Sequence, residues 1–271
     1  MKITRISLYV VLIIMGIIVS VPFIAAFMTS FKQISEIYVS YWALPQGLYL
    51  GNYVQAFEVL GSPLMNSFII TIPATLLTVF LGSLGAYGLS KFRFRLSNPY
   101  YYLMLASTLI PGHTIIAPIF NLWGSLSLID TFQGIILIET IFSVPYAVII
   151  MKSFFDQIPQ EILDAARIEG CSSISLYWQM IIPMSIPALI SAFILEFVYI
   201  WNDFLWPLVL TPSGSIQPVT MAVLLMTTRY STDWGLRAAG AILISIPPLV
   251  LFVALQKYFI KGILGGAVVK G

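Results

Sequence analysis

Carboxyl groups within apolar stretches are the residues of this sequence best suited to chemistry. Glu139, Glu196 and Asp203 each lie inside or at the end of a long apolar segment. A charged carboxylate facing lipid at the middle of a membrane-spanning helix would cost about 3 kcal/mol, so these side chains should face protein or water. On a continuous helix, Glu196 and Asp203 would share one stripe with Tyr199 and Trp206.

This stripe of acceptors and aromatic rings has the chemistry of a sugar-binding surface. Its carboxylates can accept hydrogen bonds from sugar hydroxyl groups, and its rings can pack against the face of a sugar. The candidate lining of a solute pathway therefore comprises Glu139, Glu196, Tyr199, Asn202, Asp203 and Trp206. A second interpretation stays open, in which these side chains join neighbouring helices and Asn202 and Asp203 cap a helix end.

The sequence lacks the residue sets that catalysis or metal binding needs. His113 is the single histidine and Cys171 the single cysteine, which argues against a metal site and against Ser/His/Asp catalysis. No phosphate-binding loop of the G-x-x-x-x-G-K-[ST] type is present. We therefore predict no catalytic residue, no metal site and no cofactor on this chain. If ATP drives the protein, another chain binds ATP and Mg and hydrolyses the nucleotide.

The composition predicts a protein that crosses a membrane several times. Charged residues make up 9% of the 271 residues and hydrophobic residues 59%, whereas roughly 25% charged residues is usual. The net charge of +2 gives no reason to expect nucleic-acid binding. The expected fold class is all-α, a polytopic membrane protein with one domain over residues 1–271. Its six transmembrane helices would lie at about 8–28, 66–90, 100–123, 134–151, 188–210 and 238–259.

The basic residues predict the orientation of these spans. With six spans, both termini lie on the same side of the membrane. That side would hold ten of the 13 Lys and Arg residues, and the opposite side would hold Lys32, Arg229 and Arg237. Basic residues are enriched in cytoplasmic loops, so we expect a multi-pass protein of the cell membrane with both termini in the cytoplasm. Residues 29–65 would then form an external loop.

Two prolines mark the third span. Pro111 and Pro118 flank His113 and Thr114. Proline removes a backbone donor and clashes with the preceding turn, so this helix should be kinked or broken. Such a break persists at membrane depth only where protein or a water-filled cavity satisfies the freed backbone groups.

Residues 153–187 form a polar insertion between the fourth and fifth spans. They hold four of the chain's 11 acidic residues. A proline at the first position, a basic residue in the last turn and Gly170 at the C-cap predict a short helix over 159–169. A serine cap at 172 or 173 begins a second helix, which Pro183 interrupts. The insertion therefore reads as helix, glycine corner, helix, on the cytoplasmic side.

The motif that begins at Asp164 and continues through Gly170 to Pro183 resembles the Glu-Ala-Ala loop of ABC importer permeases. Asp164 stands where that family usually has Glu. The family's loop is a coupling helix that docks on a cytoplasmic ATPase subunit. The resemblance implies this coupling role for Ile162, Asp164, Ala165, Ala166, Glu169, Gly170 and Pro183. Small residues would let the partner backbone approach, and apolar anchors would come from Ile162, Leu163 and Ile168.

Further matches extend the resemblance from about Asn52 to Gly271. Residues 86–91 look like the end of the family's second span, and residues 201–204 resemble its Trp-Asn-Asp/Glu-Phe signature. Residues 266–271 look like the closing motif of the carbohydrate-uptake branch, the group that includes the maltose transporter. The resemblance implies a sugar permease that forms half of a pathway with a homologous second permease. Two cytoplasmic ATP-binding-cassette ATPase subunits and an external solute-binding protein would complete the complex.

Three alternatives remain at the level of sequence. Another solute such as glycerol phosphate is possible within the same family, although it would favour a basic pathway and no Lys or Arg lies in the interior of a predicted span, away from its ends. An ion-coupled secondary transporter could use Glu139 and Glu196 as proton carriers. It would work without nucleotide and would have no use for a docking loop. A membrane-embedded enzyme is the third alternative, disfavoured by the missing catalytic groups.

Overall fold

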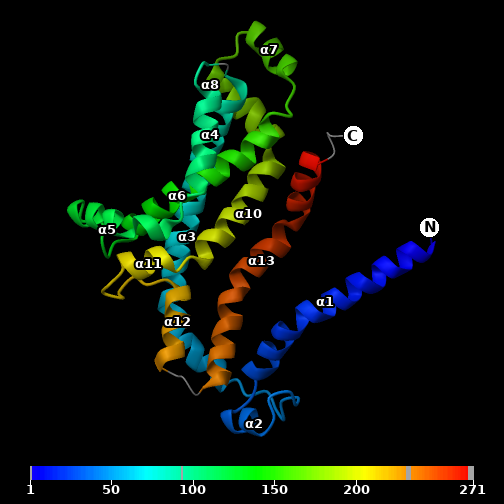
Figure 1. Ribbon diagram of the computed structural model, residues 1–271, viewed down its shortest axis with the longest axis vertical. Coiled ribbons are helices and arrows are strands. Elements are labelled where there is room, and N and C mark those ends of the chain that lie inside the picture. Colours follow the sequence, from blue (N-terminus) through cyan, green and yellow to red (C-terminus); the bar gives the residue numbers. More distant parts are fainter. Residues whose placement is uncertain (1, 93, 230–232, 268–271) are drawn as a thin grey trace. The chain divides into compact units, whose positions relative to one another are not determined.

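The described chain is mostly helical. A computed structural model describes residues 2–92, 94–229 and 233–267, and no β-strand occurs within these ranges (Figure 1). The predicted all-α fold class is therefore confirmed. The side chain of His113 and residues 268–271 of the closing motif lie outside the described part of the chain.

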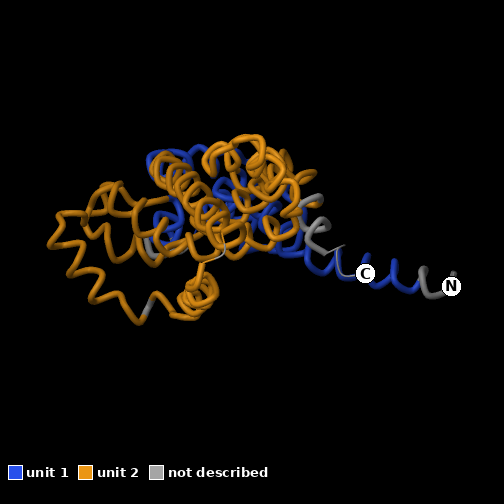
Figure 2. The backbone as a smooth tube through the Cα atoms, turned by 90° about the horizontal axis from the view of Figure 1, so that it is seen from above, with its two compact units in different colours: residues 1–64, 219–246 blue, residues 65–218, 247–271 orange. Residues whose placement is uncertain are grey.

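The chain divides into two compact units, which Figure 2 shows in different colours. The first unit comprises residues 1–64 and 219–246, and the second comprises residues 65–218 and 247–271. The predicted coupling residues and pathway residues all belong to the second unit. The single domain expected from the sequence stays a prediction.

The first unit is built around the segment that follows the first helix. Its elements are α1 (Lys2–Ser30), α2 (Ile34–Val39), the start of α3 (Gly51–Lys91), α12 (Val219–Arg229) and the start of α13 (Trp234–Ala267). The Asn52 side chain, which is 5% exposed, donates hydrogen bonds to the carbonyls of Ser30 and Lys32, both at 2.9 Å. Because α3 begins at Gly51, the part of the expected external loop from residue 51 to residue 65 is helical.

The second unit contains the remaining helices. They are α4 (Ser97–Thr108), η1 (Gly112–Ile115), α5 (Ile116–Ser125), α6 (Phe132–Phe155), α7 (Gln160–Ile168), α8 (Ser173–Leu176), η2 (Tyr177–Ile181), α9 (Ile182–Met184), α10 (Ile186–Asn202) and α11 (Leu205–Leu210). Helix α6 packs against α4, α10 and α11. Helices α3 and α6 approach closely, since a Cβ atom placed on Gly82 would lie 2.5 Å from the Cβ of Ala147.

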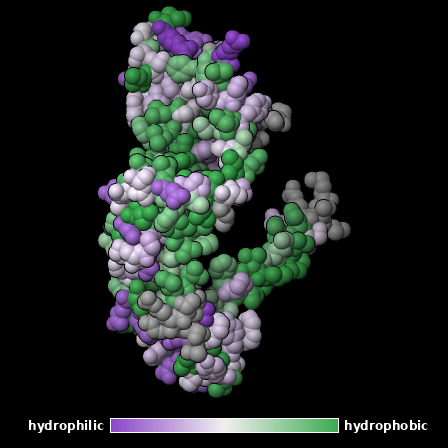
Figure 3. All heavy atoms as spheres, turned by 60° about the vertical axis from the view of Figure 1, so that its left-hand side comes forward, coloured by the Kyte–Doolittle hydropathy of each residue, from purple (hydrophilic) through white to green (hydrophobic). Residues whose placement is uncertain are grey.

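Four described helices are long and apolar enough to cross a membrane. They cover Ser7–Ser30, Gly51–Lys91, Phe132–Phe155 and Trp234–Ile260. A fifth crossing results if Ser173–Met184 and Ile186–Asn202, which meet at 78°, form one bent span. Apolar side chains cover much of the face shown in Figure 3, as lipid-facing helices require. The protein is thus a multi-pass membrane protein, and the number of six spans stays a prediction.

The third expected span is interrupted at its first proline. Helix α4 ends at Thr108, and η1 begins after Pro111, whose backbone is extended with φ −66° and ψ 128°. Proline cannot donate a helical hydrogen bond and keeps the preceding residue away from helical geometry. The predicted break is confirmed. Helix α4 has 12 residues and α5 has 10, each shorter than the roughly 20 residues that a straight span needs.

Candidate functional site

Helix α7 and the turn after it form the first half of the polar insertion. The helix covers Gln160–Ile168, within one residue of the predicted bounds. Gly170 has a φ of +90°, and its N–H donates to the Arg167 carbonyl at 3.0 Å. The Cys171 N–H donates to the Ala166 carbonyl, also at 3.0 Å. These two bonds are the Schellman closure that a left-handed glycine permits, so the predicted helix and glycine corner are confirmed.

The second helix of the insertion begins at the predicted serine cap. Ser172 Oγ accepts the Ser175 N–H at 3.2 Å, and the helix continues through α8, the π-helical turn η2 and α9. The π turn directly precedes Pro183, which lacks an N–H and would clash with the carbonyl of Gln179 in a regular helix. The helix therefore passes Pro183 and stops only at Met184, before the bend into α10.

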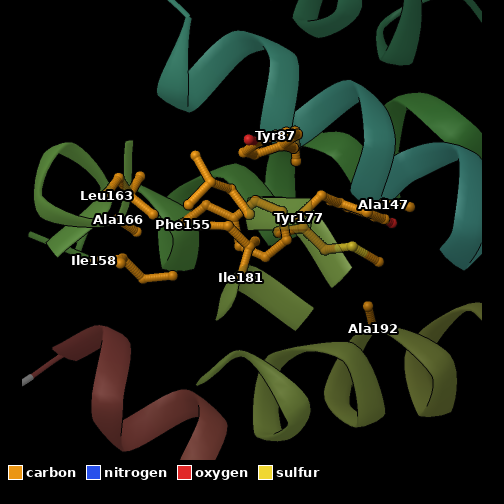
Figure 4. Packing of buried hydrophobic residues seen from close by; sticks show 12 residues of the cluster. Tyr87, Ala147, Phe155, Ile158, Leu163, Ala166, Tyr177, Ile181 and Ala192 are labelled. Atoms are coloured by element: carbon orange, nitrogen blue, oxygen red, sulfur yellow. The ribbon is translucent and has the colours of Figure 1, made fainter. Parts of the chain in front are cut away.

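One face of α7 packs against other residues of the second unit (Figure 4). Leu163 is fully buried and Ala166 is 8% exposed, and both belong to a hydrophobic cluster with Phe155 and Tyr177. This arrangement differs from the expectation that Leu163 is a docking anchor and Ala166 part of the docking surface. The two side chains are unavailable to a partner because they fill the core beneath the helix.

The opposite face of α7 and the glycine corner are open. Five predicted coupling residues are exposed there, namely Ile162, Asp164, Ala165, Glu169 and Gly170. Ile168, at the end of α7, is 88% exposed. An isoleucine this exposed among polar neighbours is well placed to fill a pocket on a partner. Pro183 is exposed as well, but it lies on α9 beyond the corner.

A polar pocket of about 580 Å³ opens beside α7. Its charged lining comes from Lys91, Asp156, Asp164 and Arg167. Asp164 Oδ1 accepts a hydrogen bond from Arg167 Nη1 at 2.9 Å, and this exposed pair stabilises the helix by only about 0.5 kcal/mol or less. Sequence reasoning did not identify Lys91 as part of this site. Its Nζ donates to the Ile158 carbonyl at 2.7 Å.

Buried carboxyl groups lie where α6 packs against α10. Glu139 on α6 is 2% exposed and Glu196 on α10 is 3% exposed. The carboxyl group of Glu139 lies close enough to that of Asp203 for the two to interact electrostatically. Glu196 lies near the Ser143 hydroxyl, although that contact lacks the geometry of a full hydrogen bond.

The predicted stripe on the fifth span is interrupted after Asn202, where α10 ends. Asp203 has an extended backbone, with φ −67° and ψ 138°. Its carboxylate accepts the N–H groups of Leu205 at 3.3 Å and Trp206 at 3.1 Å, and so caps the start of α11. The expectation of one continuous helical stripe is therefore wrong, because the chain begins a new helix in another direction.

The structure brings only part of the predicted pathway set together. Tyr199 is 53% exposed and lies within electrostatic reach of Glu139 and Asp203. Trp206 is 5% exposed and belongs to a separate hydrophobic cluster. The Asn202 amide donates to a carbonyl of its own helix at 2.7 Å. Glu139, Tyr199 and Asp203 thus form an acidic cluster with one accessible phenol, and its solute-binding role stays a prediction.

Apolar spans that carry a polar insertion, with a capped helix and a glycine corner, fit the membrane component of a transport system. Residues 78–265 match the family described as "Binding-protein-dependent transport system inner membrane component". The chain belongs to this family, as its sequence motifs predict. The family is one of transport proteins and is not catalytic.

Relatives and a solved structure agree with this assignment. The chain is 31% identical over 268 residues to the glucose import system permease protein GlcU of Saccharolobus solfataricus, covering 95% of this chain and 93% of GlcU. It is 28% identical over 269 residues to the sn-glycerol-3-phosphate transport system permease protein UgpE of Yersinia pestis, covering 94% of each. A bacterial ABC transporter that imports alginate has a chain of the same fold, with a TM-score of 0.78 and 22% identity, covering 95% of this chain and 97% of that one.

Proposed function

We propose that this chain is the permease subunit of an ATP-driven importer for sugars and that α7 couples it to ATP hydrolysis. The proposal rests on the geometry at the tip of the polar insertion. A helix closed by a left-handed glycine holds exposed Ile162 and Ile168 above a rigid, buried face. Such a short, pre-organised helix can fill a groove on a partner at little cost in conformational entropy.

The partners follow from the family and from what this chain lacks. An external solute-binding protein delivers the solute, and a homologous second permease completes the pathway. Two cytoplasmic ATPase subunits bind ATP and Mg, because this sequence contains no phosphate-binding loop. Both termini and the insertion lie on the cytoplasmic side in this proposal, in accordance with the basic residues at the termini.

A neutral sugar suits the acidic cluster better than glycerol phosphate does. Asp203, the less buried carboxyl group of the cluster, would repel a phosphate group, whereas its oxygen atoms can accept hydrogen bonds from sugar hydroxyls. The named relatives include permeases for both kinds of solute. The preference for a sugar over glycerol phosphate therefore rests on the acidic cluster. A secondary transporter driven by protons is disfavoured by the family and by the docking surface on α7.

Isolation of the complete complex tests the proposal. The complex would be purified from its native membrane through a tag on this chain, and the solute retained by its binding protein would be identified by mass spectrometry. We expect a neutral sugar and ATP-dependent uptake of that sugar into proteoliposomes. Uptake that continues without ATP, or a retained phosphorylated solute, would contradict the proposal.

Thiol labelling tests the predicted orientation. Cys171 is the single cysteine and is partly exposed next to the glycine corner. A membrane-impermeant thiol reagent should label Cys171 in inside-out vesicles and leave it unlabelled in intact cells. In a Cys171→Ser background, Val39→Cys provides the matched control, because Val39 is 86% exposed in the segment after α1. It should label only in intact cells, and the opposite pattern for either cysteine would overturn the orientation.

A further inference from the structure

Three polar side chains follow one face of α3 near its end at Lys91. Ser83, Tyr87 and Lys91 are spaced by four residues, so they lie one above another on the same side of the helix. They are 1%, 6% and 7% exposed, respectively. Polar groups buried this completely need hydrogen-bond partners. We call these three residues the α3 ladder.

Two members of the α3 ladder, Lys91 and Tyr87, bind the backbone of the polar insertion on either side of α7. Lys91 Nζ donates to the Ile158 carbonyl at 2.7 Å, just before α7 begins. The Tyr87 hydroxyl donates to the Ser173 carbonyl at 3.0 Å, in the first residue of α8. Because the two acceptors bracket α7 and the glycine corner, these bonds hold both ends of the coupling helix.

The third member of the ladder fixes the helix that follows the corner. Ser83 Oγ and the Tyr177 hydroxyl share a hydrogen bond at 2.6 Å. The rings of Tyr87 and Tyr177 also lie in contact, with centroids 5.3 Å apart. Tyr177 is 3% exposed and begins the π turn, so the ladder reaches from the start of α7 into η2.

The α3 ladder is attached to a rigid base. The backbone of α3 is pressed against α6 at Gly82, opposite Ala147, and at Gly85, where an added Cβ would lie 3.0 Å from Val148. Helix α6 leads directly into the loop that holds Ile158. The loop is therefore held from two helices, and any displacement of α7 must either move α3 or break the ladder.

Lys91 is a costly residue for a purely structural position. Burying an ammonium group is unfavourable unless it is hydrogen-bonded, and an apolar side chain of similar length would fill the same space without this penalty. Asp156, Asp164 and Arg167 line the same polar pocket as Lys91. The placement is better explained by a need to hold the Ile158 carbonyl in position than by packing.

We propose that Ser83, Tyr87 and Lys91 are positioning residues, which fix α7 to α3 so that a displacement of α7 by the ATPase is transmitted to the membrane-spanning part of α3. This inference rests on the proposed coupling role of α7. Loss of a ladder bond would leave the docking surface in place but would allow α7 to move without α3. ATP would then be hydrolysed with less transport for each ATP consumed.

The test combines a distance measurement with the ratio of sugar uptake to ATP hydrolysis. In the assembled complex, with Cys171→Ser and no other cysteines, spin labels are placed at Glu161→Cys on α7 and Leu81→Cys on α3. Both positions are exposed in this chain, and Leu81 is not a ladder residue. Distances are measured without nucleotide and after trapping with MgATP and vanadate. Uptake is measured with the sugar that the binding protein retains.

When the α3 ladder is unsubstituted, we expect one narrow distribution of distances between the two spin labels, and trapping should not change it. Lys91→Met should broaden the distribution and lower the ratio of uptake to hydrolysis several-fold in each assembled complex, and Lys91→Arg should restore both. Lys257→Met is the matched control, because Lys257 is exposed on α13 and contacts the ring of its neighbour Tyr258. It should change neither quantity.

The outcomes separate this inference from the proposed function. If Lys91→Met prevents assembly, Tyr87→Phe removes a single hydroxyl and should produce the same broadening and loss of coupling. A narrow distance and an unchanged ratio in the ladder variants would overturn the inference while ATP-driven uptake by the unsubstituted complex still supported the function. Uptake that is independent of ATP in the unsubstituted complex would overturn both.

Discussion

Gly170→Trp is expected to abolish ATP-driven uptake while leaving membrane insertion intact. Gly170 has a φ of +90°, and among the described residues no atom outside its two sequence neighbours lies within 4 Å of an added Cβ. The indole therefore has room in the isolated subunit but protrudes from the corner where the ATPase must approach. Uptake into proteoliposomes, with the amount of inserted permease measured by immunoblotting, checks this result. Normal uptake would show that the glycine corner is not part of the docking surface.

Substitutions at a second glycine distinguish the effect of backbone strain from the effect of blocked docking. Gly214 also has a left-handed backbone, with a φ of +74°, and lies outside the polar insertion. Alanine at either position should cost about 1–2 kcal/mol through strain alone. Gly170→Ala and Gly214→Ala should therefore destabilise the protein to a similar extent, while Gly214→Trp should retain uptake that Gly170→Trp lacks. Equal loss of uptake in the two tryptophan variants would indicate strain as the cause.

Asp203→Ala is expected to lower the yield of assembled complex. The change leaves the N–H groups of Leu205 and Trp206 without their acceptor. Each unsatisfied group costs about 1–3 kcal/mol, so the loss is large against the stability of a typical protein. Size-exclusion chromatography in detergent measures the yield. Asn202→Ala is the neighbouring control and should assemble normally, since the hydrogen bond that its amide donates runs to a carbonyl of its own helix.

Tyr199→Phe tests the solute pathway without the structural effect of Asp203. Tyr199 is 53% exposed beside the acidic cluster, so its hydroxyl can reach a solute and its loss leaves little buried polarity unsatisfied. We expect an unchanged yield of complex and a several-fold higher sugar concentration for half-maximal uptake. Unchanged uptake kinetics for every transported sugar would leave the cluster with a structural role alone.

The long helices and the corner could be predicted from sequence because their signals are local. Apolar length indicates the spans, proline marks the interruption before η1, and Gly170 with the preceding basic turn marks the end of α7. Each of these features depends on the chemistry of neighbouring residues and on backbone geometry, which the sequence states directly.

The errors arose where distant segments decide the outcome. Ile162, Leu163 and Ile168 are all apolar, and only the core beneath α7 determines that Leu163 is the buried one. The apolar run after Asn202 suggested a continuing helix, although the second interpretation already placed Asp203 as a cap at a helix end. The spacing of the α3 ladder was visible, but its partners lie 67 to 94 residues away in sequence.

Photo-crosslinking from α7 tests the central claim most directly. A photoreactive amino acid at Ile168, which is 88% exposed, would be activated in the native membrane, and the adducts would be identified by mass spectrometry. Coupling through α7 predicts an adduct with an ATP-binding subunit from Ile168 and none with that subunit from Tyr38, which is 68% exposed in α2. The absence of an ATPase adduct at Ile168, in a complex that still hydrolyses ATP, would contradict the account.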